Sequence, residues 1–341
     1  MFPKWYNQYM FSTKDHVLGA LIRAEGHISG ESISEKLGIS RAAVNNAVKA
    51  LRSEGYEIDS STKRGYLLQS DADRLNPGSM LAYLGSDRAG HVICLDEVDS
   101  TNRYLKDLAF DGVPDGTVVI ADRQTKGRGR LGRSFCSPEA KGLYLSYLFR
   151  PSGRNIEITD LTSIAAVAVC DSIEKVTGIR PQIKWVNDIL MNSRKICGIL
   201  TELSVESESG LIDSAVIGIG ININEKDTDF PEEIRSMAGS VSMAAGHEVL
   251  RAKIATELIT RLDELLSGNT DRGIIVKLYR DACITPGREI SAVRIHDGGN
   301  ARHGKALSIN DDFSLKVQFE DGSIEDLISG EVSIKGLYGY V

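Results

Sequence analysis

A short basic segment, residues 126–133 with the sequence KGRGRLGR, contains residue types that bind phosphates. Its glycines Gly127, Gly129 and Gly132 have the G-x-G-x-x-G spacing of a dinucleotide-binding Rossmann turn. Such a turn requires a helix that begins at the third glycine and an acidic residue about 20 positions further on. Here the following residues, SFCSPEAKG, lead into the strand-like segment LYLSYLF, and no acidic residue ends a second strand at the expected place. The context therefore excludes a Rossmann turn.

The arginines of this segment indicate a different chemistry. Arg128, Arg130 and Arg133 are able to neutralise a carboxylate and a phosphate that approach each other. The glycines would let the loop fold down on such a ligand and keep it mobile while the site is empty. This combination suits a reaction that joins a carboxylate to the α-phosphate of ATP. Taken alone, the segment is equally consistent with a solvated basic loop that binds nothing, or that binds RNA.

The composition restricts the possible protein classes. The chain has 341 residues, 42% of them hydrophobic, which leaves room for about two or three domains with ordinary cores. We expect a cytoplasmic protein without a membrane span, because no apolar run of about 18 residues occurs and the N-terminus lacks a secretory signal pattern. The five cysteines include no C-x-x-C pair, so neither a disulfide framework nor a zinc site is indicated. A net charge of −7 argues against a protein that coats nucleic acid with its whole surface.

Residues 14–69 have the pattern of a winged helix-turn-helix. Two short amphipathic segments are followed by a glycine turn and by a third segment, RAAVNNAVKALRSEG, in which Val44, Val48 and Leu51 form one apolar stripe. Ser40 is placed to cap that helix, and YEIDSSTKRGYLL has the composition of a hairpin. The order of three helices and a hairpin is that of a winged helix. A three-helix protein-interaction domain remains as the alternative.

The exposed start of the third helix and the hairpin carry residues that would contact DNA. Amide side chains pair with adenine edges, and arginine pairs with guanine or phosphate. Between residues 40 and 64, five basic residues stand against three acidic ones, a local charge of +2 that agrees with one DNA-facing surface. The candidate DNA-binding residues are Ser40, Arg41, Ala42, Asn45 and Asn46 on the helix, and Lys63 and Arg64 on the wing.

The rest of the chain divides into three parts. Residues 70–80 are polar and rich in turn signals, which predicts a linker. Residues 81–284 contain adjacent strand-like runs between two long amphipathic segments, which predicts a mixed α+β domain rather than repeated βαβ units. The expected strands include TVVIADRQ, LYLSYLF, IKWVNDILMN, KICGILTEL and SAVIGIGININ. Residues 285–341 show short strands separated by turn signals such as Asp297-Gly298, which predicts a small β-barrel.

The chain contains five short polar or glycine-bearing motifs, namely Ser100-Thr101-Asn102, Gln124 with residues 127–133, Lys184-Trp185-Val186-Asn187-Asp188, Arg194-Lys195-Ile196-Cys197-Gly198-Ile199-Leu200, and Gly220-Ile221-Asn222. In their order and spacing, these motifs resemble those of biotin–protein ligases. With the winged helix in front and the small barrel behind, the chain resembles the bifunctional biotin–protein ligases that also repress the biotin operon. The resemblance covers the chain from about residue 13 onward. It implies a multidomain α+β protein with a central biotin/lipoate-ligase-like domain and a C-terminal SH3-like β-barrel.

The resemblance also implies roles for individual residues. The biotin-binding candidates are Ser100, Thr101, Asn102, Gln124, Gly127, Arg128, Lys195 and Gly198. The ATP-binding candidates are Arg130, Arg133, Phe135, Asn187, Asp188, Lys195 and Asn222, and Mg²⁺ would accompany the ATP. The catalytic candidates are Arg128, Arg130, Lys195 and Asp188. Neutral hydroxyl and amide groups suit the ureido group of biotin, since each buried donor must meet an acceptor.

Several of these residues also have a purely structural interpretation. Ser100 and Thr101 would cap a helix at NRYLKDLA, and Lys195 would be a solvated lysine. Asn187-Asp188 would form a turn at the end of a strand. The chain has Val186 where the family usually has proline. It has Phe135 where the family often has tryptophan, so stacking on adenine is expected to be weaker.

The implied reaction has two steps. Biotin and MgATP form biotinyl-5′-AMP and pyrophosphate, and the acyl group then passes to the ε-amine of one lysine on a biotin carboxyl carrier protein. The other implied partners are operator DNA and a second copy of the chain, with dimerisation promoted by the ligand. Three alternatives stay open: a lipoate or octanoate ligase, a non-catalytic biotin-sensing transcription factor, and a ligase whose winged helix does not bind DNA.

Overall fold

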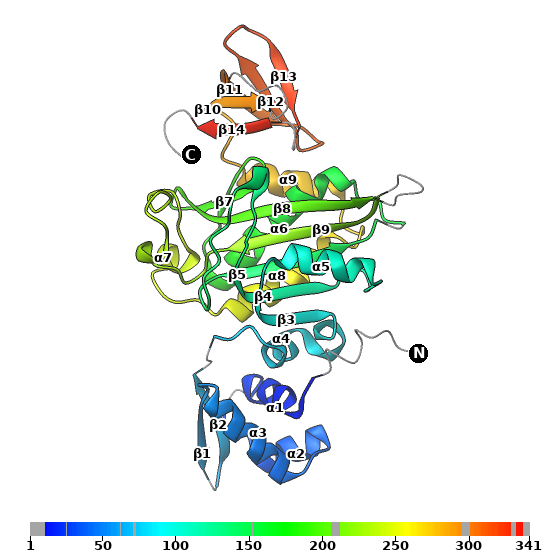
Figure 1. Ribbon diagram of the computed structural model, residues 1–341, viewed down its shortest axis with the longest axis vertical. Helices are drawn as coiled ribbons and strands as arrows, with labels where there is room; N and C mark the ends of the chain where they lie inside the picture. Colours follow the sequence, from blue (N-terminus) through cyan, green and yellow to red (C-terminus); the bar gives the residue numbers. More distant parts are fainter. Residues whose placement is uncertain are drawn as a thin grey trace.

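The structure is a computed structural model, and it describes residues 11–24, 26–61, 63–70, 73–151, 153–205, 212–294, 301–328 and 332–336. Three structural units follow one another along the long axis of the molecule (Figure 1). A small helical unit with a hairpin lies at one end, a large sheet covered by helices lies in the middle, and a smaller sheet lies at the other end. Among these described ranges, no helix is long and apolar enough to cross a membrane.

The N-terminal unit is a winged helix, as predicted. It contains α1 Thr13–Ile22, α2 Gly30–Leu37, α3 Arg41–Ser53 and an antiparallel hairpin of β1 Glu57–Ser61 and β2 Gly65–Ser70. Helices α2 and α3 each begin after a serine, Ser29 and Ser40, whose hydroxyl accepts a backbone N–H. Gly38, with a φ of 64°, ends α2 in the left-handed conformation that glycine adopts without strain. The apolar stripe of α3 is buried, so its opposite face remains open to solvent.

A helix rather than a linker joins the wing to the central sheet. This helix, α4 Pro77–Ala89, begins inside the range 70–80 that was expected to be a linker. It packs on α1 so closely that a Cβ at Gly78 would lie 2.9 Å from the side chain of Leu18. The irregular connection is therefore shorter than predicted, and α4 docks the winged helix on the central unit (Figure 1).

The central unit is built on a seven-stranded mixed sheet. Its strands are β3 Val92–Val98, β4 Val118–Gln124, β5 Leu143–Phe149, β6 Gln182–Lys184, β7 Asp188–Met191, β8 Arg194–Val205 and β9 Ile212–Ile221. Their order is β3-β4-β5-β9-β8-β7-β6, in which β3 and β4 are parallel and all other neighbours are antiparallel. The predicted mixed α+β domain is thereby confirmed. The stretch IKWVNDILMN, expected as one strand, instead forms β6 and β7 with a turn at residues 185–187 between them.

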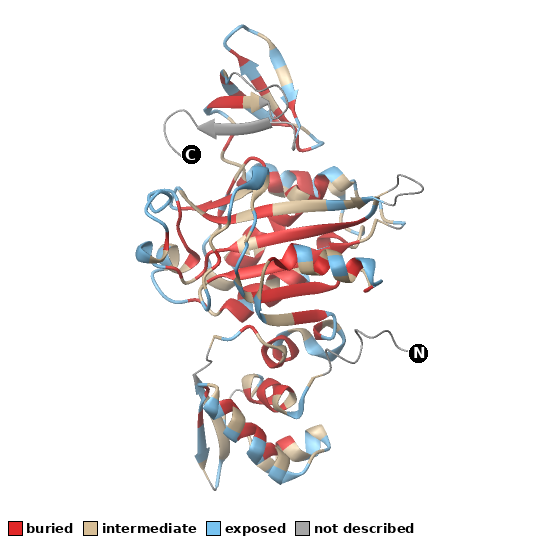
Figure 2. Ribbon diagram, viewed as in Figure 1, coloured by how far each residue is buried: buried red, intermediate tan, exposed pale blue. Residues whose placement is uncertain are grey.

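Helices cover both faces of this sheet. They are α5 Thr101–Phe110 on one face and α6 Leu161–Thr177, α8 Arg251–Leu265 and α9 Arg272–Ala282 on the other. The short helix α7 Val241–Ala245 lies among the loops at one end of the sheet (Figure 1), and short 3-10 segments span Arg130–Gly132, Ile158–Asp160 and Asp227–Asp229. Successive strand residues point to opposite faces, so Val119 packs under α5 while Val118 and Ile120 join the main core beneath α6 and α8. Figure 2 shows the middle strands as buried. The sheet is thus a rigid support for the loops at its edge.

The C-terminal unit is a five-stranded antiparallel sheet. Its strands are β10 Glu289–Arg294, β11 Arg302–Ile309, β12 Leu315–Phe319, β13 Ile324–Leu327 and β14 Val332–Gly336. In the order β13-β12-β11-β10-β14, the outer strands β13 and β14 do not pair with each other within the described ranges. The sheet is therefore open in these residues, and a closed SH3-like barrel is not confirmed. The turn predicted at Asp297-Gly298 lies outside the described residues.

Candidate active site

A pocket opens at one end of the central sheet, where β4, the turn between β6 and β7, and the glycine-rich loop meet. It collects most of the predicted site residues, namely Ser100, Thr101, Asn102, Gln124, Arg128, Arg130, Arg133, Phe135, Asn187, Asp188, Lys195 and Gly198. Ten further residues line the pocket that were not among the predicted site residues: Gly129, Leu131, Ser134, Lys184, Trp185, Ile199, Leu200, Gly218, Ile219 and Gly220. Motifs separated by more than a hundred positions in the chain therefore form one site.

One wall of the pocket consists of neutral hydrogen-bonding groups. The side-chain oxygen of Gln124 accepts from the backbone N–H of Thr101 at 2.9 Å and from the Thr101 hydroxyl at 3.1 Å. The Gln124 amide donates to Oγ of Ser137 at 3.1 Å. Ser100 precedes α5, but its side chain makes no capping hydrogen bond, so the structural interpretation of this hydroxyl is not supported. The pocket-lining side chains Ser100, Thr101 and Gln124 are called the neutral wall below.

Asn102 lies deeper, at the junction of α5 and the sheet. Its side-chain nitrogen donates to the carbonyl of Leu200 at 3.2 Å and to Oε2 of Glu202 at 2.8 Å, and its Oδ1 lies 2.6 Å from Oγ of Ser146. A Cβ at Gly218 would come within 2.2 Å of Asn102 Oδ1. The glycine in β9 is therefore required by the close approach of this amide. No local signal in the sequence connects the two residues.

The floor of the pocket is a pair of glycines under the ring of Phe135. Gly198 of β8 and Gly220 of β9 face each other across the two strands. A Cβ at Gly220 would lie 2.7 Å from the Phe135 ring. The ring also meets Tyr144 edge-on, with 6.4 Å between the centroids. Phe135 thus lies inside the pocket on a surface without side chains, as a residue that covers a flat ligand would.

The glycine-rich loop folds back on itself over the pocket. Gly129 donates its N–H to the carbonyl of Arg133 at 2.7 Å, and Phe135 donates its N–H to the carbonyl of Gly127 at 2.9 Å. A Cβ at Gly127 would lie 2.4 Å from the backbone oxygen of Phe135, whereas a Cβ at Gly129 would have only ordinary contacts. Gly127 is therefore needed for this fold of the loop, although it does not itself line the pocket.

Cationic groups surround the opposite side of the pocket. The Lys195 ammonium lies 2.5 Å from Oδ1 of Asp188, and Arg130 donates through Nη1 to Oδ1 of Asn187 at 3.1 Å. Burial lowers the pKa of the Arg130 guanidinium, with the charge of Asp188 opposing the shift. Burial likewise lowers the pKa of Lys184, a lysine of the same motif for which no role was predicted. A group of partly buried cations attracts anions strongly, so this side suits a carboxylate or phosphates.

Asn222 does not reach the pocket. Its side chain is buried and donates through Nδ2 to the carbonyl of Gly239 at 3.0 Å. Gly239 in turn donates its N–H to the carbonyl of Lys195 at 2.9 Å. Asn222 therefore stabilises the position of Gly239 beside the strand that carries Lys195. This arrangement does not support the direct contact with the nucleotide that the resemblance implies. The motif indicated an amide side chain at this position but not its partner, because Gly239 lies 17 positions further along the chain.

The C-terminal unit supports the pocket from behind. Trp185 is 4% exposed, and its indole N–H donates to the carbonyl of Phe313 at 2.8 Å. Its backbone N–H donates to Oγ1 of Thr285 at 2.9 Å. The turn that separates β6 from β7 is thus held by residues of the segment that follows α9. Trp185 also lines the pocket, so this support acts directly on the site.

The predicted DNA-binding residues lie on the surface of the winged helix. The Ser40 hydroxyl caps α3 by accepting from the N–H of Ala43 at 3.1 Å, so this side chain has a structural task. Arg41 is exposed and pairs with Glu31. The remaining candidates, Ala42, Asn45, Asn46, Lys63 and Arg64, are exposed on the helix start and the wing. The structure therefore leaves these side chains open to a ligand.

Comparisons with known proteins agree with these observations. The family described as Biotin/lipoate A/B protein ligase family matches residues 94–222, and an HTH domain family matches residues 13–67. The chain is 36% identical over 310 residues to the Bifunctional ligase/repressor BirA of Bacillus subtilis, covering 90% of this chain and 94% of the relative. It is 30% identical over 323 residues to the protein of the same name from Escherichia coli, covering 94% and 96%.

A solved structure extends the likeness to the fold. The Biotin protein ligase from Aquifex aeolicus in complex with biotin and ATP is 31% identical, with a TM-score of 0.62 over 72% of this chain and 98% of that one. On the extent and identity of the matches, the chain belongs to the biotin/lipoate A/B protein ligase family.

Proposed function

We propose that this protein is an ATP-dependent, AMP-forming biotin–protein ligase that also represses transcription by binding operator DNA. One observation carries the ligase function: a single pocket holds the neutral wall beside a group of cationic side chains. Gln124 and Thr101 suit an uncharged ureido ring, since each buried polar group finds a partner. Arg128, Arg130 and Lys195 suit two anions that must meet.

The first step joins biotin to the nucleotide. A carboxylate oxygen of biotin attacks the α-phosphorus of ATP, the bond from this phosphorus to the bridging oxygen breaks, and pyrophosphate leaves. Arg128, Arg130 and Lys195 neutralise the charge that accumulates at this junction and hold the reactants in line. Closure of the glycine-rich loop excludes water, which would otherwise hydrolyse the product.

The second step transfers the acyl group. The ε-amine of a lysine on a biotin carboxyl carrier protein attacks the acyl carbon, the bond to the AMP oxygen breaks, and the amine loses a proton. Asp188, a carboxylate that lines the pocket, is the candidate for accepting this proton. Products are the biotinyl amide and AMP.

The binding roles divide between the two sides of the pocket. Ser100, Thr101, Asn102, Gln124 and Gly198 would contact biotin, and Gly127 would shape the loop that covers it. Arg130, Arg133, Phe135, Asn187 and Asp188 would contact the nucleotide. Phe135 would cover the adenine, because its ring lies in the pocket against Gly198 and Gly220, where no side chain intervenes.

Mg²⁺ would enter with ATP. Asn187 and Asp188 present side-chain oxygens in the pocket, and oxygen is the ligand that Mg²⁺ prefers. Within the described part of the chain, no group of three His, Cys, Asp or Glu side chains is placed to hold a metal. When bound, the ion would offset part of the triphosphate charge.

The winged helix supplies the second function. Its exposed residues Arg41, Asn45, Asn46, Lys63 and Arg64 would contact the operator. A homodimer would bring two such units to the half-sites of a palindrome. We propose that ordering of the glycine-rich loop around biotinyl-5′-AMP promotes this dimer, so that operator binding reports the supply of biotin.

The test begins with the purified protein, biotin and MgATP, without acceptor protein. Mass spectrometry of the protein fraction is expected to show retained biotinyl-5′-AMP. Biotin binding without adenylate would favour a non-catalytic sensor. Competition between biotin and lipoate identifies the substrate, and lipoyl-AMP in place of biotinyl-AMP would contradict the proposal. A mobility-shift measurement on promoter DNA then separates a repressor from a ligase that does not bind DNA.

A further inference from the structure

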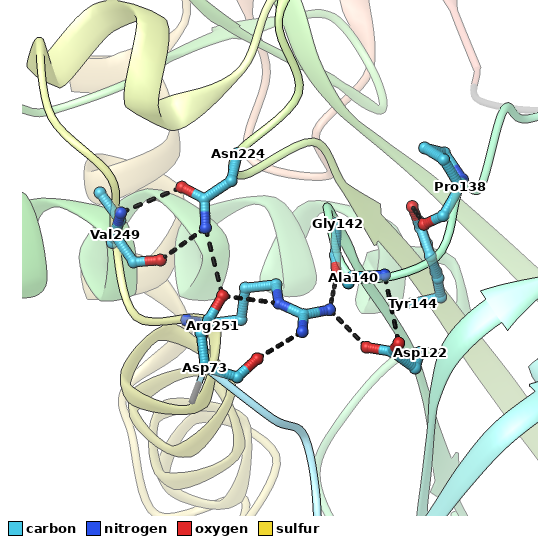
Figure 3. Close-up of polar contacts among 9 residues, drawn as sticks. All are labelled: Asp73, Asp122, Pro138, Ala140, Gly142, Tyr144, Asn224, Val249 and Arg251. Carbon is cyan, nitrogen blue, oxygen red and sulfur yellow. Dashed lines mark hydrogen bonds and ion pairs between the residues drawn. The ribbon is translucent and has the colours of Figure 1, made fainter. Parts of the chain in front are cut away.

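An ion-pair cluster around a buried arginine joins the segment after the wing to the central sheet (Figure 3). Its centre is Arg251, the first residue of α8, which is 1% exposed. Arg251 Nε lies 2.9 Å from Oδ2 of Asp73, and Nη1 lies 2.6 Å from Oδ1 of Asp122. The same guanidinium donates to the backbone carbonyls of Asp73 and Gly142. One side chain thus holds three chain segments that are far apart in sequence. Together with Asn224 we name these side chains the Arg251 cluster.

Asp73 belongs to the short connection between β2 and α4, yet its carboxylate is fixed from two other directions. The backbone N–H of Arg251 donates to its Oδ1 at 2.8 Å, and Asn224 donates to its Oδ2 at 3.3 Å. Asn224 is itself held by the backbone of Val249 through two hydrogen bonds (Figure 3). Burial raises the pKa of Asp73, against the charge of Arg251. The connection from the winged helix is therefore anchored inside the central unit.

Asp122 carries this anchor to the pocket. It lies in β4 two residues before Gln124, so both side chains point to the same side of the strand. Oδ2 of Asp122 accepts the backbone N–H of Ala140 at 3.1 Å. Ser137, in the same loop, accepts from the Gln124 amide at 3.1 Å. Both the strand and the loop that orient Gln124 are thus tied to Asp122.

The loop has a further contact that limits its movement. The Tyr144 hydroxyl donates to the carbonyl of Pro138 at 3.0 Å (Figure 3). With Arg251 on the carbonyl of Gly142, both ends of residues 138–142 are bound to the sheet or to α8. A displacement of Arg251 would therefore break two contacts: its hydrogen bond to the loop at Gly142 and its ion pair with Asp122.

We propose that Asp73 and Arg251 are positioning residues for biotin, which act through Asp122 on the orientation of Gln124. The inference rests on the proposed function, since it concerns the biotin side of that pocket. A buried ion pair is a weak source of stability, because desolvation of the charges offsets their attraction. We infer that this ion pair acts by fixing positions: it holds the connection from the winged helix to β4, the strand that carries the proposed biotin contact Gln124.

The experiment uses the full chain with Asp73→Asn. Asparagine has the size of aspartate and leaves Arg251 paired with Asp122, so the variant is expected to fold. We expect the Kd for biotin, measured by calorimetry, to rise by about fivefold or more, while the KM for MgATP remains unchanged. If Asp73→Asn does not fold, Arg251→Lys keeps the buried charge and is measured in the same way. A general loss of structure would change both constants together.

The matched control is Asp263→Asn. Asp263 of α8 also binds an arginine, Arg88, at 2.5 Å, and Arg88 donates to the carbonyl of Gly116 before β4. This pair lies at the far end of β4 from Gln124, so its loss is expected to leave the biotin Kd unchanged. A biotin Kd for Asp73→Asn within twofold of the parent, or equal to that of the control, overturns the inference. Failure of the parent itself to bind biotin would instead overturn the proposed function.

Discussion

Lys195 and Asp188 form an ion pair inside the pocket, with 2.5 Å between Nζ and Oδ1. Asp188 begins β7 and Lys195 is the second residue of β8, so the pair spans neighbouring antiparallel strands. The side chains are 31% and 19% exposed, which keeps the ammonium partly shielded from water. Charge interactions are stronger in such surroundings than in bulk solvent. A carboxylate or phosphate entering the pocket therefore meets an ammonium that is already in place.

Replacement of this lysine by a neutral side chain removes that charge. For Lys195→Met we expect the rate of biotin-dependent pyrophosphate release to fall by about 100-fold or more. Lys141→Met is the control, since Lys141 has a similar exposure of 36% and also pairs with an aspartate, Asp229, at 3.8 Å, but does not line the pocket. Equal rates for Lys195→Met and the parent would exclude a catalytic role for this ammonium.

The two glycines of the loop differ in what surrounds them. Gly127→Ser would force a Cβ within 2.4 Å of the backbone oxygen of Phe135, whereas at Gly129 the nearest atom would lie at 3.5 Å. We expect Gly127→Ser to weaken biotin binding by about tenfold and to reduce the ligand-promoted dimer. Gly129→Ser is expected to remain close to the parent. Calorimetry and sedimentation velocity measure the two effects.

The loop-ordering mechanism also predicts that Gly127→Ser dimerises less than the parent when both are saturated with ligand. If Gly127→Ser dimerises with biotinyl-5′-AMP as readily as the parent at full occupancy, the loop does not couple the ligand to the dimer. The proposed ligase chemistry would then remain, and the regulatory part would need another route.

The wing is expected to affect DNA and not catalysis. Arg64 is exposed on the wing, so Arg64→Ala should reduce operator affinity and lower the slope of log K against log salt by about one. Lys277→Ala removes one exposed charge from α9 and serves as the control. Fluorescence anisotropy at several salt concentrations measures the slope. An unchanged slope, or a loss of biotinylation activity, would contradict the assignment of Arg64 to DNA.

Glu225 gives the protein a pH-dependent stability. The residue is 1% exposed, and burial raises the pKa of its carboxyl from 4.5 to about 7. Because the folded state binds this proton more tightly than the unfolded state does, the folded state loses stability as the pH rises from 4.5 to about 7. At about 1.36 kcal/mol for each pH unit, the loss amounts to about 3 kcal/mol.

Glu225→Gln removes the buried charge. We expect the variant to be more stable than the parent at pH 8 and to lose this advantage below pH 4.5. Urea unfolding across this range measures the difference, and Glu139→Gln, at an exposed position, is the control. A difference that does not change with pH would show that the folded state does not raise this pKa.

Much of the fold and of the site could be predicted because the relevant signals are local. The serine caps, the apolar stripe of Val44, Val48 and Leu51, and the glycine at position 38 each act within a few residues, so the sequence predicted the winged helix. The pocket residues were also predictable, because their motifs resemble those of biotin–protein ligases in order and spacing. The residue types indicate the chemistry: neutral amide and hydroxyl groups suit an uncharged ring, and cationic groups suit a carboxylate and phosphates.

Other features depend on contacts between distant parts of the chain, and they became evident only from the fold. The break between β6 and β7 depends on Trp185 binding Phe313 and Thr285, and the side chain of Asn222 turns away from the pocket to Gly239. Asp73 and Arg251 are 178 positions apart, so no local pattern predicts that they meet. Local patterns in the sequence were sufficient to identify most of the elements and the chemistry that the motifs carry. Packing decided which side chains reach the pocket. A buried polar group is costly without a hydrogen-bond partner, so a side chain such as that of Asn222 turns toward the partner that the fold provides.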